Sequence, residues 1–152
     1  ENAPAFRFIQ DPIPLEVDFT PALEAKLDGQ THRLKAGNQS FYIGQADAAK
    51  CEIGSVMRLR NAYVVKINQK ESIRLNAQFV STALLEKTQP ANWLISGVDV
   101  AITMPDNTVV FGLAEEALKK MEEGNEVYFS QFGYCRIDQK TRTEIQLWFT
   151  HP

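Results

Sequence analysis

The sequence predicts an all-β fold, a barrel or a sandwich, and three observations support this. Short β-rich runs follow one another along most of the 152 residues. Turn clusters such as DGQ, KAGNQ, NQKE and PDN separate these runs. Only one segment shows clear helical spacing. This combination is typical of barrels and sandwiches, whereas βαβ units would alternate strands with helices.

Each β-rich run gives one expected strand. In chain order, these are Pro14–Phe19, Leu23–Asp28, His32–Leu34, Ser40–Gly44, Ser55–Ile67, Ser72–Val80, Asn92–Ser96, Val98–Met104, Thr108–Phe111, Glu126–Tyr134 and Glu144–Thr150.

The run Ser55–Ile67, SVMRLRNAYVVKI, is the most informative of these strands. Side chains alternate between the two faces of a strand. One face is therefore apolar and interrupted only by Asn61; it carries Met57, Leu59, Tyr63, Val65 and Ile67. The other face presents Arg58, Arg60 and Lys66. Two guanidinium groups one strand period apart lie ~7 Å from each other, which suits neighbouring nucleotides of an RNA loop. A solvated strand face with two scattered charges is the alternative.

The segment Leu113–Gly124, LAEEALKKMEEG, is the one expected helix. Its apolar residues share one helical face, with acidic residues in the first turn and lysines later. Gly124 suits the position after a helix.

Composition excludes several classes of function. The net charge of −3 argues against a general RNA-binding protein, so an RNA site must be a local patch. Cys51 and Cys135 form no C-x-x-C pair, and buried free thiols are favoured over a disulfide. No run of ~20 apolar residues occurs, so we expect no membrane span and a cytoplasmic protein.

Common nucleotide-binding, hydrolase and zinc motifs are absent, and His32 and His151 stand outside any such motif. We expect no catalytic residue, metal or cofactor in this chain.

Six segments in order resemble the C-terminal anticodon-binding region of glutaminyl-tRNA synthetases and of archaeal- or eukaryotic-type glutamyl-tRNA synthetases. They are FIQDPIPLEV, FYIGQAD, GSVMRLRNAYVVK, FGLAEEAL, VYFSQFGYCRID and LWFTH. The R-L-R-N-A-Y-V element is the most specific, followed by G-Y-x-x-x-D. The signal at Gly112–Glu116 and the ending WFTH resemble the glutamyl branch more than the glutaminyl branch.

This resemblance implies two small, packed antiparallel β-barrels of the ribosomal protein L25 type, with residues 23–90 as the distal barrel and 1–22 with 91–152 as the proximal one. The barrels would bind the anticodon loop of tRNA. Reading unstacked loop bases is also the general mode of sequence-specific RNA recognition. ATP and the chemistry would belong to a catalytic domain or subunit of the synthetase, which is a further expected partner.

The resemblance also implies the binding residues. Arg58 and Arg60 match two arginines that contact the anticodon, and Lys50 matches a basic contact position less closely. At three further positions this chain differs from the contact residues of the family. An arginine that precedes the D-P pair in the family aligns with Ala5, and Arg7 could replace it. A glutamine aligns with Tyr128, which could stack on a base or belong to the core. A further arginine aligns with Gln131.

Two other functions stay open. The chain could be a non-catalytic β-barrel adaptor that binds protein, which the acidic balance and the residues Ala5 and Gln131 favour. It could also be an unrelated single-strand binder of the OB type, which would be indifferent to the anticodon sequence.

Overall fold

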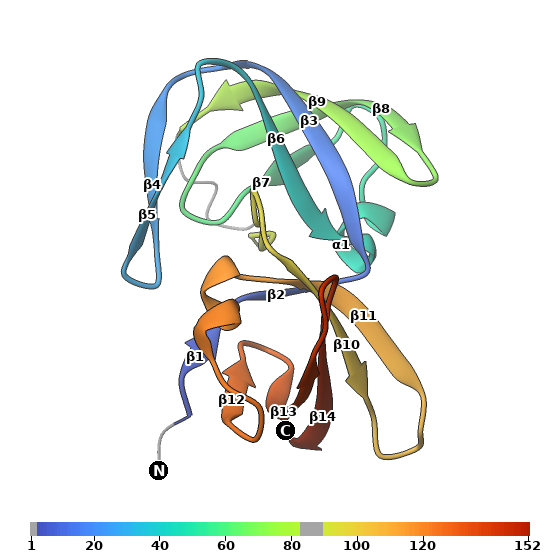
Figure 1. Cartoon of the computed structure of the whole chain (residues 1–152). Coiled ribbons are helices and arrows are strands. Elements are labelled where there is room, and N and C mark those ends of the chain that lie inside the picture. The colour runs from blue at the N-terminus through green and yellow to red at the C-terminus, as the bar shows by residue number, and fades with distance from the viewer. Residues whose placement is uncertain (1–2, 83–89) are drawn as a thin grey trace. The chain divides into compact units, whose positions relative to one another are not determined.

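The computed structural model describes residues 3–82 and 90–152, and it confirms the all-β fold class (Figure 1). The strands are β1 (Ala5–Phe6), β2 (Phe8–Gln10), β3 (Pro12–Thr20), β4 (Leu23–Leu27), β5 (Gln30–Leu34), β6 (Gly37–Gly44), β7 (Val56–Arg58), β8 (Val64–Glu71), β9 (Arg74–Ser81), β10 (Val98–Thr103), β11 (Val109–Ala114), β12 (Glu126–Phe129), β13 (Gly133–Lys140) and β14 (Ile145–His151). Within the described ranges, the helices are α1 (Gln45–Ala49) and the 3₁₀ helix η1 (Glu116–Lys120).

The chain forms two compact units. Unit 1 consists of Glu1–Pro12 and Ser96–Pro152, and unit 2 consists of Ile13–Ile95. Cys51 lies in unit 2 and Cys135 in unit 1, and both are buried and free, as the sequence favoured.

Unit 1 is built on a sheet with the strand order β1-β12-β13-β14-β10-β11-β2. Two of its pairings, β1 with β12 and β10 with β14, are parallel, whereas antiparallel barrels were expected. Parallel neighbours need a connection that crosses over, which the long excursions between these strands provide. The inward residues form one apolar core, which includes Phe8, Val100, Ile102, Leu118, Val127, Phe129 and Leu147.

Unit 2 combines a sheet of order β6-β3-β9-β8-β7 with the β4–β5 hairpin. Strands β3 and β9 pair in parallel. Figure 1 shows the strands of this unit curving around its interior. Trp93, Phe41 and Tyr63 lie at the centre, with edge-to-face ring contacts of 5.3 Å between Phe41 and Trp93 and 5.9 Å between Phe41 and Tyr63.

The expected single strand Ser55–Ile67 is wrong, because this run is a hairpin. Strand β7 ends at Arg58, the chain turns, and β8 returns antiparallel from Val64. Asn61 adopts a φ of 56° in this turn, a left-handed conformation that asparagine tolerates better than most residues. The expected inward residues are nevertheless buried, since a hairpin can keep the same alternation on each arm.

The expected helix Leu113–Gly124 is also wrong in extent and type. Leu113 and Ala114 belong to β11, where they pair with Ile9 and Phe8 of β2. Only the five residues Glu116–Lys120 turn helically, and Met121 is extended again. By Gly124 the chain has joined the next hairpin, since the Gly124 N–H donates to the Ile137 carbonyl at 2.7 Å. Sheet pairing on both sides therefore leaves room for little more than one helical turn.

Two further expected strands differ. The run Glu126–Tyr134 contains a turn, so β12 ends at Phe129 and β13 begins at Gly133. The run Asn92–Ser96 is not a strand, and only Leu94 forms an isolated bridge, with Tyr42. Helix α1 was not expected, because five residues are too few for a helical pattern to show in the sequence.

Candidate nucleic-acid interface

The turn that carries Arg60 and Asn61 is held firmly by its own backbone and by neighbours in unit 2. The Leu59 N–H donates to the Tyr63 carbonyl at 2.9 Å, and the Ala62 N–H to the Leu59 carbonyl at 3.0 Å. The Asn61 side-chain amide donates to the Lys26 carbonyl at 3.0 Å. The Asn61 side chain therefore ties this turn to strand β4.

The Arg60 guanidinium is oriented by two side chains from other segments. Its Nη2 lies 3.2 Å from Asp28 Oδ1, and its Nη1 donates to Asn92 Oδ1 at 3.3 Å. The Arg60 carbonyl accepts a 2.8 Å hydrogen bond from the Trp93 indole. The side chain stays 34% exposed. Arg60 is thus a partly exposed cation that contacts two side chains of other segments.

Arg58 lies at the end of β7 and is partly buried. Its Nε is buried and has no hydrogen-bond partner among the residues that the structure describes. Buried polar groups nearly always have partners, so this N–H is an unsatisfied hydrogen-bond donor.

Lys50 borders a pocket of about 250 Å³ in unit 2. The pocket is lined by Asp47, Lys50, Cys51, Ser55, Val56, Met57 and Ala91. Ala91 connects this pocket to both arginines: its N–H donates to the Arg58 carbonyl at 2.8 Å, and its carbonyl accepts from the Arg60 N–H at 3.0 Å. Burial raises the pKa of Asp47, which the charge of Lys50 partly offsets. The structure thus brings Arg58, Arg60 and the Lys50 pocket into one region.

In unit 1, Arg7 is 1% exposed and lies against Glu115. Its main-chain N–H donates to Glu115 Oε2 at 2.6 Å, and its Nε lies 3.3 Å from the same oxygen. A guanidinium in this place would have to leave a buried ion pair to reach RNA. Arg7 is therefore a poor replacement for an arginine at Ala5.

Tyr128 and Gln131 lie near each other in unit 1, on β12 and on the turn that follows it. Tyr128 is partly exposed, whereas Val127 and Phe129 on either side point into the core, so Tyr128 is not a core aromatic. Gln131 is exposed, with a left-handed φ of 63°. The register pairs Ala5 with Tyr128, so two of the positions that depart from the resembled pattern lie side by side.

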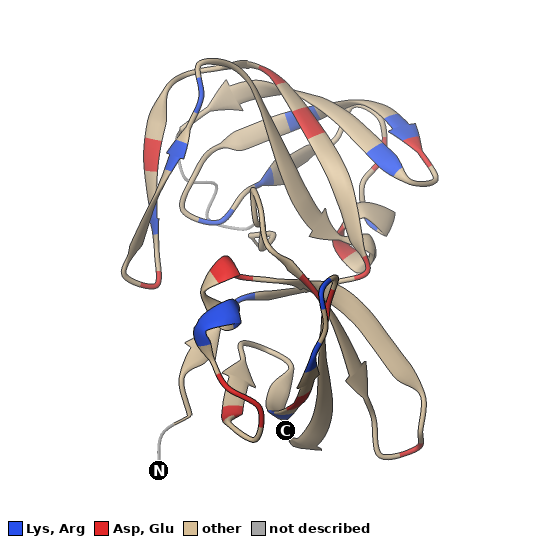
Figure 2. Cartoon of the chain, in the orientation of Figure 1, with Lys and Arg blue, Asp and Glu red and all other residues tan. Residues whose placement is uncertain are grey.

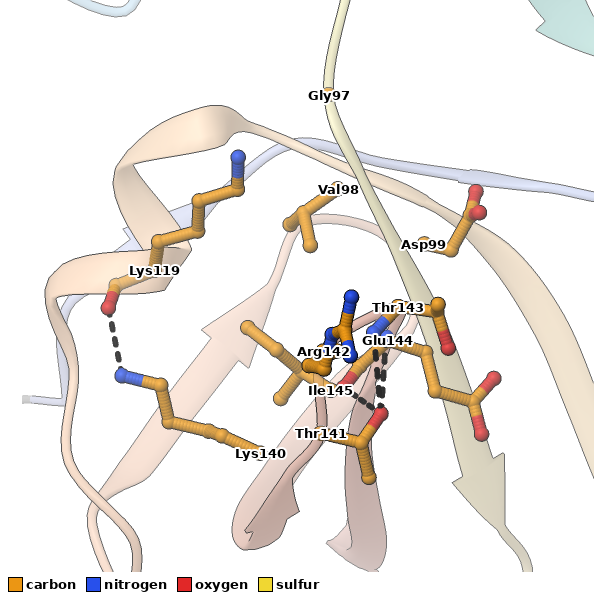
Figure 3. A pocket seen from close by; sticks show the side chains of 10 residues that line it. All are labelled: Gly97, Val98, Asp99, Lys119, Lys140, Thr141, Arg142, Thr143, Glu144 and Ile145. Carbon is orange, nitrogen blue, oxygen red and sulfur yellow. Dashed lines mark hydrogen bonds between the residues drawn. The ribbon is translucent and has the colours of Figure 1, made fainter.

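A second pocket, of about 410 Å³, lies in unit 1 and is lined by none of the expected contact residues (Figure 3). It lies beside the start of β10, η1 and the β13–β14 turn. The Lys140 ammonium donates to the carbonyls of Lys119 and Met121 at 2.7 and 2.8 Å. The Lys119 ammonium lies 2.9 Å from Glu116. None of the residues that the sequence indicated as contacts lines this pocket, so it is the weaker candidate.

Charge is mixed over both units. Figure 2 shows Lys and Arg interspersed with Asp and Glu, in keeping with the net charge of −3. No group of three or more His, Cys, Asp and Glu in the described part of the chain could hold a metal ion. No helix among the described residues is long and apolar enough to cross a membrane.

Sequence reasoning proposed Arg58, Arg60 and Lys50 as contact residues but did not indicate Asp28 and Asn92, which orient Arg60. Asp28 was readable only as part of the Asp-Gly turn between β4 and β5, and Asn92 only as part of an expected strand. Neither pattern indicates a partner about thirty residues away in the sequence.

Comparison with known proteins finds archaeal glutamate–tRNA ligases. That of Methanosarcina barkeri is 27% identical over 95% of this chain and 26% of its own length. That of Methanocella arvoryzae is 28% identical over 99% of this chain and 28% of its own length. That of Pyrococcus abyssi is 23% identical over 95% of this chain. No family model matches the chain. The chain spans about a quarter of the length of these relatives, and over nearly all of its own length it is similar to one region of archaeal glutamate–tRNA ligases.

Proposed function

We propose that this chain binds the anticodon loop of a tRNA and gives tRNA specificity to a glutamate–tRNA ligase. The observation that carries the proposal is the similarity to glutamate–tRNA ligases over 95% of the chain. The relatives' name identifies tRNA as their substrate, and Arg58, Arg60 and Lys50 of unit 2 would supply suitable donors. Because the chain spans only 26% of such a relative, the ATP-dependent chemistry would belong to another domain or subunit, which is the second proposed partner.

In this proposal, the Arg60 turn provides the directed contact. Arg offers several N–H donors in a planar fork, which matches phosphate and base edges. Asp28 and Asn92 hold two of the guanidinium nitrogens, so the half-exposed group is already positioned for the remaining donors to meet RNA. Preorganisation of this kind lowers the entropy cost of binding.

Arg58 and Lys50 complete the proposed contact set in unit 2. The partly exposed Arg58 side chain would contact RNA. The Lys50 pocket, with polar residues and the apolar Met57 and Val56, has the mixed lining that suits an unstacked base. We propose Tyr128 and Gln131 as contacts from unit 1 and leave Arg7 out.

The test is titration of a fluorescently labelled tRNA-Glu transcript with the chain and its variants. Arg58→Ala, Arg60→Ala and Lys50→Ala are each expected to weaken binding by roughly 5-fold to 150-fold, which corresponds to a lost bidentate or charged contact. Arg74→Ala, an exposed charge on β9 of the same unit, is the matched control and should bind normally. Thermal melting of each variant separates lost contacts from lost folding.

The same titration separates the other functions. Anticodon binding predicts weaker affinity for a transcript with a changed anticodon, and an affinity that falls steeply with salt through counterion release. A transcript of tRNA-Gln, used at matched concentrations, distinguishes a glutaminyl from a glutamyl role. Equal affinity for every anticodon would favour a general single-strand binder. Absence of any salt-dependent tRNA binding would contradict the proposal and favour a protein-binding adaptor.

A further inference from the structure

Unit 1 carries a row of side chains across the outer face of four neighbouring strands. The register places Ala5 of β1 beside Tyr128 of β12, Tyr128 beside Tyr134 of β13, and Tyr134 beside His151 of β14. The residues adjacent to these in sequence, such as Phe129 and Cys135, are buried in the core. The row therefore lies on the side of the sheet that faces away from the core.

The three rings of the row are in contact. The ring centroids of Tyr128 and Tyr134 are 4.8 Å apart. Those of Tyr134 and His151 are 4.4 Å apart, with 26° between the ring planes, which is a stacked arrangement. The His151 side chain is 57% exposed, and Ala5 is exposed with only a methyl group beside Tyr128. Both ends of the row are thus open to a further flat group.

The backbone of β13 and β14 is shaped to bring Tyr134 and His151 together. A register shift separates Tyr134 from Cys135, and irregularities of this kind re-aim side chains. Gly133 has a φ of 143°, and a Cβ there would lie 2.6 Å from the Phe149 ring and 2.9 Å from the His151 carbonyl. Only glycine permits this close approach. Glu126 Oε2 accepts from the Thr150 hydroxyl at 3.1 Å and lies 3.7 Å from His151 Nε2, at the same end of the row.

We propose that the Tyr128–Tyr134–His151 row is a stacking platform for an unpaired nucleobase of single-stranded RNA. Every base has a flat π face, and aromatic side chains on a sheet are a general means of holding unstacked bases. This inference rests on the proposed function and adds to it: Tyr134 and His151 join Tyr128 as contact residues, and the recognition here is by stacking and not by charge.

The test uses the full chain and tRNA-Glu transcripts with 2-aminopurine at each anticodon-loop position in turn. Stacking quenches this base, so wild-type protein should quench one position strongly. Tyr128→Ala, Tyr134→Ala and His151→Ala should relieve that quenching and weaken binding at least about fivefold. Tyr128→Phe keeps the ring and should retain both. Because His151 is exposed, His151→Ala remains a fair test even where Tyr134→Ala proves unstable.

The matched control is Phe111→Ala, which removes another exposed aromatic, 57% accessible, from β11 of the same unit. It should leave binding and quenching unchanged. Salt gives a second readout, because stacking releases no counterions: the alanine variants of the row should keep the wild-type slope of affinity against salt, whereas Arg58→Ala and Arg60→Ala should reduce it.

The outcomes separate the two proposals. If the chain binds tRNA-Glu and the arginine variants weaken it, yet the ring variants bind and quench like wild type, the platform is refuted and the proposed function stands. If wild-type protein binds no tRNA, the proposed function is wrong, and the platform, which rests on it, is refuted with it. Loss of quenching in the ring variants at an unchanged salt slope supports the platform.

Discussion

Asn61 is the residue on which the geometry of the Arg58–Arg60 region depends most. Its φ of 56° places it in the left-handed region, and its amide donates to the Lys26 carbonyl at 3.0 Å. Asn61→Gly keeps that backbone free of strain but loses one hydrogen bond, for about 0.5–1.5 kcal/mol. Asn61→Val adds a β-branched side chain in this region, for about 1–2 kcal/mol more. The free energy of unfolding, measured with denaturant, should therefore be highest for wild type, lower for Asn61→Gly and lowest for Asn61→Val.

The same pair of variants tests whether the turn positions Arg60. Asn61→Val is expected to weaken tRNA binding more than Asn61→Gly under conditions in which both remain folded. Equal unfolding free energies for the two variants would contradict the left-handed turn.

Residue patterns predicted the inward face of this hairpin but not the turn itself. Met57, Leu59 and Val65 alternate in a continuous strand and in a hairpin alike, so periodicity does not distinguish the two. The polar Asn61 was the only local sign of the break. The contact partners Asp28 and Asn92 were hidden, because contacts between distant segments leave no trace in one sequence.

At the scale of elements, the β1–β2 segment and the β11–η1 junction are joined by the buried Arg7–Glu115 pair. The two side chains are 1% and 9% exposed. Glu115→Gln keeps an oxygen for the Arg7 main-chain N–H but removes the negative charge that faces the buried Arg7 guanidinium. Removing one partner of a buried pair costs about 3–5 kcal/mol. We expect Glu115→Gln to lower the free energy of unfolding by this order, measured by urea denaturation.

A second substitution provides the control for this prediction. Arg7→Met in the Glu115→Gln background removes the buried positive charge as well and should recover much of the loss, as apolar replacements of buried pairs often do. A double variant less stable than Glu115→Gln would show that the cost comes from packing and not from charge.

This junction also explains why a helix was predicted here and is nearly absent. The pattern of LAEEALKK is helical in spacing, and Leu118 is indeed fully buried. However, pairing of β11 with β2 extends to Ala114, and Glu115 is committed to Arg7. Sheet pairing and an ion pair from distant residues override the local preference, which a single sequence does not reveal.

At the scale of the whole molecule, each unit has its own apolar core and one buried thiol within it. Burial raises the pKa of Cys51, and burial with the nearby Glu126 charge raises that of Cys135 to about 12. Both groups therefore stay protonated at pH 8 and should react slowly with iodoacetamide in the folded protein. A raised pKa means that the folded protein favours the protonated thiol. The stability that each thiol contributes is therefore fully present below the ordinary thiol pKa of about 8.5 and is lost as the pH rises above it.

The two thiols can thus report on the two units separately. Alkylation across a urea series, read by mass spectrometry at each cysteine, gives one unfolding curve for each unit. Glu115→Gln weakens unit 1 and should move the Cys135 curve to lower urea more than the Cys51 curve. Ile67→Ala removes a fully buried side chain from the core of unit 2, at about 2–5 kcal/mol, and should do the reverse. Equal shifts of both curves in both variants would mean that the chain unfolds as one cooperative body, despite its two cores.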